Sequence, residues 1–234
     1  MTSELRCVYF GDSITAGQYV PPSRRWTTLL RERLSASGLS DVIYTISAVS
    51  GETTRQGLER FPSQVQSVRP HVLTIQFGLN DCNRWQTDEG LPRVSEPAFE
   101  ANLLEMIQRA RRFGTSQVIL LTNHPTLRTT VFEDGATYED ARRRYNEIVR
   151  RVARDAEVQL HDIEAAFAPI EDRLAELLME PPDVLHLSAA GHAVYADLLE
   201  PVLREALLAA RRMAGEEPSP VGVATAEERD ANAR

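Results

Sequence analysis

The sequence predicts an α/β protein, a three-layer sandwich in which helices cover both faces of a central, mostly parallel five-stranded sheet. Two observations indicate this class. Short apolar runs rich in β-branched residues alternate with longer segments of helical periodicity up to about residue 212. The apolar runs are nearly continuous, as is typical of parallel strands buried on both faces. A chain of 234 residues with 42% hydrophobic content can enclose one sizeable core, so we expect one domain, over residues 1–213.

The elements follow from the periodicity. Five segments have the composition of strands, namely 5–10, 42–46, 72–77, 118–122 and 158–161. Four segments carry apolar residues at helical spacing and are expected to be the crossover helices, namely 26–36, 57–68, 97–113 and 138–156. Ser188 is a plausible N-cap for a last helix, whose apolar stripe from Tyr195 to Leu207 would pack on the sheet and close the fold.

The composition changes after this helix. From residue 214 the chain is rich in Glu, Pro, Ser, Gly, Ala and Arg, and it contains no aromatic residue. Such a segment offers too little apolar area to offset the entropy lost on ordering. We therefore expect residues 214–234 to form a flexible C-terminal tail.

Charge and composition exclude several classes of function. The formal net charge of -8 would repel nucleic acid. All 26 basic residues are arginine, which excludes a Walker loop, a kinase-type phosphate lysine and a Schiff-base amine. The five histidines show no metal-type spacing, so we predict no metal and no cofactor. No apolar run is long enough to span a bilayer, and we expect a cytoplasmic protein.

The first candidate site segment is Gly11-Asp12-Ser13, where the first strand ends and a turn leads into a helix. Ligands of open parallel sheets bind at this carboxyl edge. A serine at such a turn has the helix N-terminus and its own backbone N–H close to a developing oxyanion. Taken alone, the segment also fits an ordinary turn with a helix cap.

The second candidate is Asp183 with His186, in the loop before the last helix. Asp and His three residues apart can lie side by side, so that the carboxylate fixes the tautomer of the imidazole and the other ring nitrogen can take a serine proton. Two further segments, around Gly51 and Asn80, also follow strands and could supply oxyanion donors. Each alone also fits ordinary turn chemistry, but all four share one edge of the sheet.

Four blocks give the sequence a strong resemblance to the SGNH or GDSL hydrolase family: Gly-Asp-Ser-Ile-Thr, Ser-Gly-Glu-Thr, Gly-Leu-Asn-Asp and Asp-Val-Leu-His. The blocks lie between residues 10 and 192, and the chain resembles the bacterial thioesterase/lysophospholipase branch. The resemblance implies a flavodoxin-like fold and a serine esterase without a cofactor. It also implies that Ser13 is the nucleophile, His186 the general base and Asp183 its partner, with Gly51 and Asn80 as oxyanion donors.

The chain departs from the family pattern at two places. Members often carry an asparagine where this chain has Ile46-Ser47, and a glycine where it has Val184. Neither change removes a catalytic group.

We expect hydrolysis of a small acyl or acetyl ester through an acyl-enzyme. An acyltransferase with the same intermediate, and a silent module that binds a glycan or lipid, remain open alternatives. The sequence determines neither the acyl and alcohol parts of the substrate nor the oligomeric state.

Overall fold

The computed structural model describes residues 4–216, and it confirms the predicted α/β class. Five parallel strands form one sheet in the order β2-β1-β3-β4-β5. The strands are β1 (Leu5–Gly11), β2 (Val42–Ala48), β3 (Val72–Gln76), β4 (Gln117–Leu121) and β5 (Gln159–His161). All five lie where the sequence predicts them, with ends that differ by no more than two residues.

Burial follows the position of each strand in the sheet. Every residue of β3 is buried, and six of the seven residues of β1 are buried. The edge strands β2 and β5 are only partly covered. The continuous apolar runs are therefore most pronounced in the strands that have neighbours on both sides, as expected for a parallel sheet.

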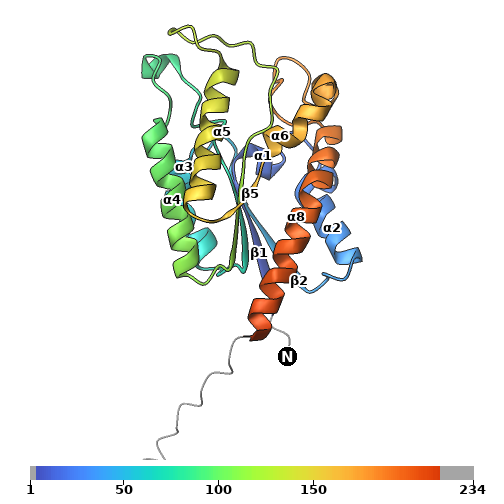
Figure 1. Ribbon diagram of the computed structural model, residues 1–234. Helices are drawn as coiled ribbons and strands as arrows, with labels where there is room; N and C mark the ends of the chain where they lie inside the picture. Colours follow the sequence, from blue (N-terminus) through green and yellow to red (C-terminus); the bar gives the residue numbers. More distant parts are fainter. Residues whose placement is uncertain (1–3, 217–234) are drawn as a thin grey trace, which may run out of the picture.

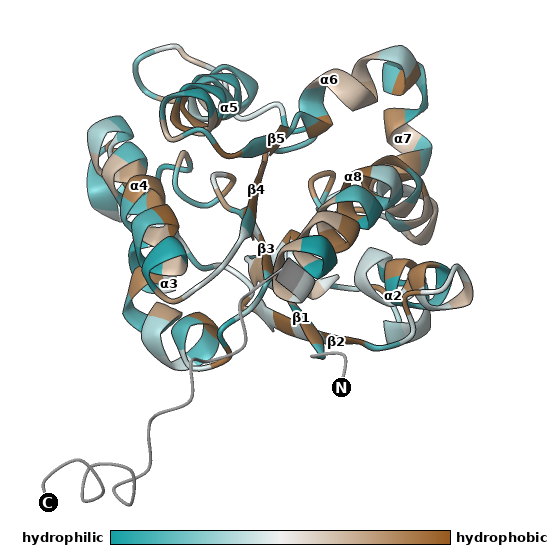
Figure 2. Cartoon of the chain, turned by 60° about the horizontal axis from the view of Figure 1, so that its bottom comes forward, coloured by the Kyte–Doolittle hydropathy of each residue, from teal (hydrophilic) through white to brown (hydrophobic). Residues whose placement is uncertain are grey.

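The helices form two layers. Helices α2 and α8 lie on one face of the sheet, and α3, α4 and α5 cover the other (Figure 1). In Figure 2 the central strands carry mostly hydrophobic residues, and the outer surfaces of the helices carry hydrophilic ones. The helices are α1 (Ser13–Ala16), α2 (Trp26–Ala36), α3 (Thr54–Phe61), α4 (Glu96–Arg112), α5 (Tyr138–Asp155), α6 (Ile163–Phe167), α7 (Leu174–Leu177) and α8 (Ala189–Glu216). Short 3-10 segments occupy Pro22–Arg24, Gln86–Asp88 and Ala168–Arg173, and a π-helical turn occupies Pro62–Gln66.

An aromatic cluster joins the sheet to the layer of α2 and α8. The ring of Trp26 lies 5.0 Å from Tyr9 of β1 and 5.2 Å from Tyr195 of α8, and all three side chains are fully buried. The Trp26 indole N–H also donates to the carbonyl of Ile14 at 2.9 Å. This bond fixes α1, the short helix that begins at Ser13, against the packed core.

Two segments differ from the sequence prediction. Helix α3 begins at Thr54 instead of residue 57, because a capping box of Thr53 and Gln56 satisfies its first backbone N–H groups. The short helices between residues 163 and 177 were not predicted at all. Their few turns carry too little periodicity to be recognised.

The C-terminal helix is longer than the sequence suggests. It continues to Glu216, so the expected domain of residues 1–213 ends inside it. Residues 217–234, most of the expected tail, lie outside the described part of the chain. No helix within residues 4–216 is long and apolar enough to cross a membrane.

Candidate active site

Ser13 lies at the turn between the central strand β1 and helix α1. Asp12 caps this helix by accepting the Ile14 backbone N–H at 3.0 Å. Gly11 is required by close approach, because a Cβ there would lie 2.7 Å from the Gln76 carbonyl oxygen and 2.3 Å from the Thr15 hydroxyl. The turn therefore packs directly on β3, and it leaves Ser13 only 5% exposed at the carboxyl edge of the sheet.

Asp183 and His186 lie in the loop between α7 and α8. The two groups interact at 2.8 Å, through Asp183 Oδ2 and His186 Nδ1. The other carboxylate oxygen, Oδ1, accepts the backbone N–H groups of His186 at 2.7 Å and Leu185 at 3.1 Å. Burial alone would raise the pKa of Asp183, but these hydrogen bonds from His186 and Leu185 hold it below its usual value. The carboxylate is thus ionised and able to accept the Nδ1 proton.

The second ring nitrogen faces the serine. His186 Nε2 lies 2.9 Å from Ser13 Oγ, across a sequence separation of 173 residues. With Nδ1 protonated against Asp183, Nε2 carries a lone pair that can accept the hydroxyl proton. The exposed ring of Tyr19 packs edge-on against the imidazole, with centroids 5.2 Å apart.

The 183–186 loop is fastened to the segment that follows β4. The fully buried His124 bonds to the Leu185 carbonyl through Nε2 at 2.9 Å, and the Leu127 N–H donates to the Val184 carbonyl at 3.0 Å. Burial lowers the pKa of His124 to about 4, so its ring is neutral and donates through Nε2–H. Val184 itself has a φ of 48°, the left-handed region in which a glycine would be unstrained.

The two candidate oxyanion donors, Gly51 and Asn80, follow β2 and β3. Asn80 donates one amide hydrogen to Asp12 Oδ2 at 3.3 Å, which leaves the second amide hydrogen unused by this bond. Gly51 has a φ of 79°, and its backbone N–H makes no hydrogen bond within the described residues. Burial raises the pKa of Asp12 to about 7.

The two loops that carry these donors are tied together. Asp81, next to Asn80, accepts from the backbone N–H of Thr54 at 2.9 Å and from its hydroxyl at 2.5 Å. Arg93 reaches back to the Gly51 carbonyl at 2.9 Å. The donors therefore lie on loops whose relative position is fixed by hydrogen bonds that do not depend on substrate.

One cavity of about 280 Å³ brings these groups together. Its lining comprises Ser13, Gln18, Ser50, Gly51, Leu79, Asn80, Asn83, Arg128, Leu185 and His186. Four of the five predicted site residues line it directly, and the fifth, Asp183, lies behind the histidine. The lining is mainly polar and neutral, and the cavity volume lies just below the usual range of about 300–1,000 Å³ for ligand sites.

Sequence reasoning did not find Gln18, Asn83, Leu185 and Arg128. Gln18 and Leu185 lie close in the chain to Ser13 and His186, and this proximity was the available signal. Arg128 lies in a connection of more than ten residues after β4 that has no motif, so only the three-dimensional structure places it at the site.

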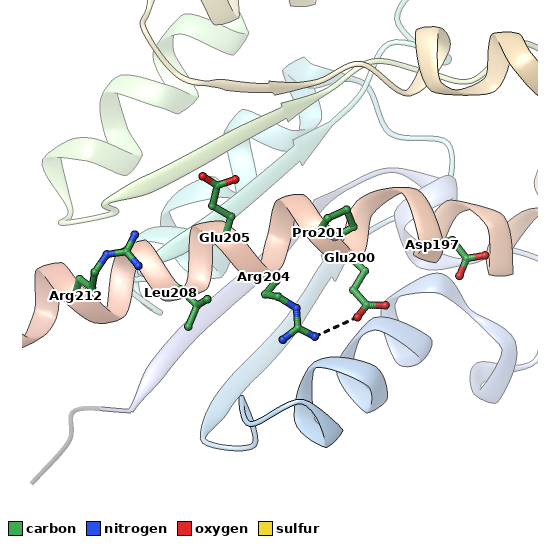
Figure 3. Close-up of a pocket in the computed structure, with 7 residues that line it drawn as sticks. All are labelled: Asp197, Glu200, Pro201, Arg204, Glu205, Leu208 and Arg212. Carbon is green, nitrogen blue, oxygen red and sulfur yellow. Dashed lines mark hydrogen bonds and ion pairs between the residues drawn. The ribbon is translucent and has the colours of Figure 1, made fainter.

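A second hollow, of about 410 Å³, lies along the outer surface of α8 (Figure 3). Its side chains are Asp197, Glu200, Pro201, Arg204, Glu205, Leu208 and Arg212. Glu200 and Arg204 pair at 3.3 Å, and Arg33 of α2 pairs with Asp197. The hollow contains no nucleophile and no histidine, so it offers none of the chemistry found beside Ser13.

Several other polar and aromatic residues make structural contacts. His192 is buried and accepts the Trp26 backbone N–H at 3.2 Å. Arg84 pairs with Asp134, and the half-exposed Trp85 lies beneath the Arg93 guanidinium. Within residues 4–216 no group of three or more His, Cys, Asp or Glu side chains could hold a metal ion.

Comparisons with known proteins place the chain among esterases and lipases. The model of the GDSL-like Lipase/Acylhydrolase family matches residues 9–194. An arylesterase of Vibrio mimicus is 28% identical over 155 residues, which cover 66% of this chain and 68% of that protein. Esterase TesA of Pseudomonas aeruginosa is 32% identical over 110 residues, 47% of this chain and half of that protein. The solved lipase/acylhydrolase from Enterococcus faecalis superposes with a TM-score of 0.69 at 25% identity, covering 86% of this chain and 96% of that one.

Proposed function

The chain belongs to the GDSL-like lipase/acylhydrolase family and is an esterase, and we propose that it hydrolyses small carboxylic esters with a Ser13–His186–Asp183 triad. The observation that carries the proposal is the continuous contact from Asp183 Oδ2 through the imidazole to Ser13 Oγ, with steps of 2.8 and 2.9 Å. Nucleophile, base and orienting carboxylate at these distances are the arrangement that acyl transfer requires.

In the first half-reaction Ser13 Oγ attacks the ester carbonyl while His186 Nε2 takes the hydroxyl proton. The resulting imidazolium is stabilised by the ionised Asp183, and it then protonates the leaving alcohol. An acyl group remains on Ser13. In the second half-reaction water attacks this acyl-enzyme with the same histidine as base, and the free acid leaves.

The oxyanion formed in both steps needs preorganised donors. We assign this role to the Gly51 backbone N–H and the free amide hydrogen of Asn80, together with the Ser13 N–H at the start of α1. The bond from Asn80 to Asp12 supports the assignment, because it holds the amide plane before substrate arrives.

The size of the cavity supports a small substrate. A volume of about 280 Å³ suits an acetyl or other short acyl ester better than a long acyl chain. The cytoplasmic location expected from the sequence stays a prediction.

The proposal is tested with 4-nitrophenyl acetate and three proteins: wild type, Ser13→Ala and Asn80→Ala. We expect Ser13→Ala to lose nearly all turnover and Asn80→Ala to lose about a hundred- to a thousand-fold in kcat. Gln108→Ala, which removes an exposed side-chain amide of α4, is the matched surface control and should behave as wild type. Full activity of Ser13→Ala would refute the triad, and full activity of Asn80→Ala would refute the oxyanion assignment.

Product analysis separates the proposal from its two rivals. With an added alcohol acceptor, we expect the free acid to remain the main product, whereas a dominant transfer product would identify an acyltransferase. A wild-type protein that binds an ester without cleaving it would identify a binding module.

A further inference from the structure

Arg128 is the single charged side chain, histidine apart, among the residues that line the active-site cavity. The remaining lining is neutral, although the whole chain carries a formal charge of -8. A lone guanidinium beside a nucleophile is costly to leave without an anion, because a half-buried charge loses hydration. The position of Arg128 therefore calls for an explanation.

Arg128 has no carboxylate partner in the described part of the chain. No ion pair or side-chain hydrogen bond of its guanidinium is found there. Its nearest defined contact is the ring of Tyr138, whose centroid lies 5.0 Å from the guanidinium carbon. Arg84, Arg142 and Arg150, by contrast, are each paired with carboxylates at 2.8 Å. The donors of Arg128 are thus available to a ligand.

The guanidinium is also held in place. Tyr138 is fully buried, and its hydroxyl donates to the Leu79 carbonyl at 2.8 Å, directly before Asn80. The backbone N–H of Arg128 donates to the Thr126 hydroxyl at 3.3 Å, and Glu139 accepts from Thr126. The preceding residue, Leu127, is bonded to the loop of His186. The ring contact and the anchored backbone orient the cation relative to the triad before substrate binds.

We propose that Arg128 is a specificity-determining residue and that the preferred substrate is a small ester bearing an anionic group, a carboxylate or a phosphate. This inference rests on the proposed function and names its substrate class. A guanidinium presents paired N–H donors that match the oxygens of either group. The anionic group can belong to the acyl part or to the alcohol part, and both sources share this chemistry.

The experiment compares matched pairs of esters. For the acyl side the pair is 4-nitrophenyl hydrogen glutarate and the neutral 4-nitrophenyl valerate. For the alcohol side it is 4-acetoxybenzoate and the neutral 4-acetoxybenzamide. Each is measured with wild type, Arg128→Gln, Arg128→Lys and the control Arg112→Gln, which removes an exposed arginine at the far end of α4. Dividing each variant's kcat/KM by that of wild type removes the intrinsic reactivity of the ester.

We expect Arg128→Gln to lower kcat/KM for one anionic ester about five- to ten-fold more than for its neutral partner, mainly through KM. Arg128→Lys should restore part of the preference, Arg112→Gln should not alter it, and salt of about 0.5 M should weaken it. If the preference changes in the acyl pair, the anionic group of the substrate belongs to the acyl part; if it changes in the alcohol pair, the anionic group belongs to the alcohol part.

Two outcomes would overturn the inference. Equal losses for anionic and neutral esters in Arg128→Gln would show that the arginine acts on the reaction itself or on folding, without selecting charge. The second outcome is a wild-type protein that hydrolyses all four esters while Arg128→Gln leaves kcat/KM unchanged for both pairs. This would leave the proposed esterase activity standing and would refute the role of Arg128 in specificity. Turnover by Ser13→Ala would contradict the proposed mechanism instead, so the two failures are distinguishable.

Discussion

Replacing Asp183 with asparagine tests whether this carboxylate sets the proton position on His186. In the structure Oδ1 accepts two backbone N–H groups, at 2.7 and 3.1 Å, and Oδ2 faces the imidazole Nδ1 at 2.8 Å. An asparagine keeps the two backbone bonds only if its oxygen takes the Oδ1 position. Its NH2 group then points at Nδ1, so Nδ1 must accept, and the proton moves to Nε2. In that tautomer the ring cannot take the Ser13 proton.

The size of the effect follows from the alternative orientation of the amide. Turning the amide to restore the productive tautomer places its NH2 against two backbone donors. Each unmade hydrogen bond costs about 1–3 kcal/mol, so the productive form lies roughly 2–6 kcal/mol higher. At about 1.4 kcal/mol per factor of ten, this predicts a loss in kcat of roughly thirty-fold to twenty-thousand-fold. The missing negative charge beside the imidazolium adds to the loss.

The assay is steady-state hydrolysis of 4-nitrophenyl acetate, together with urea unfolding of each protein. Asp197→Asn, which changes an exposed carboxylate on α8, is the matched control and should retain wild-type kcat. The reasoning is refuted if folded Asp183→Asn turns over within about ten-fold of wild type, because the tautomer would then not depend on this carboxylate.

Two further predictions concern the nucleophile turn. Burial raises the pKa of Asp12 from 3.8 to about 7, so between these values the folded state holds a proton that the unfolded state has released. The free energy of unfolding should therefore fall as pH rises from about 4 to 7, by up to about 1.4 kcal/mol per unit from this group, and urea titrations of Asp12→Asn should show a shallower slope. Part of the slope should remain in Asp12→Asn, because burial also raises the pKa of Asp81, to about 6. Identical slopes in wild type and Asp12→Asn would contradict the prediction. Gly11→Ala should lower the free energy of unfolding by about 2–3 kcal/mol, because the new Cβ meets the Gln76 carbonyl oxygen at 2.7 Å. Gly215→Ala, whose Cβ meets nothing within 4 Å, is its control, and equal stability of the two variants would count against the steric argument.

Much of the fold could be predicted because its central elements repeat a simple pattern. The β1 and β3 segments are nearly continuous apolar runs because helices cover both faces of the sheet, and α2 occupies the range that the sequence predicts. The region from residue 163 to residue 177 could not be predicted, since its helices are too short to show a clear periodicity and α7 is held by packing on α8. The start of α3 depended on the capping box at Thr53, which the apolar pattern does not contain.

The site could be predicted where a motif stands at a strand end. Ser13, Gly51 and Asn80 each follow a parallel strand, and parallel strands bring their carboxyl ends to one edge. No motif marks His124, which bonds to the Leu185 carbonyl through Nε2. Such contacts, like the position of Arg128, depend on how one loop folds onto another, which local sequence does not encode.

The contact between Ser13 and His186 joins two parts of the chain separated by 173 residues. Neither a chain that lacks the last loop nor one in which α8 has not yet docked can bring a base to the hydroxyl. Under the proposed mechanism turnover needs this contact, which closes one of the longest loops within residues 4–216. In a refolding experiment, regained turnover marks the moment when both ends of the chain are in place, whichever elements form first.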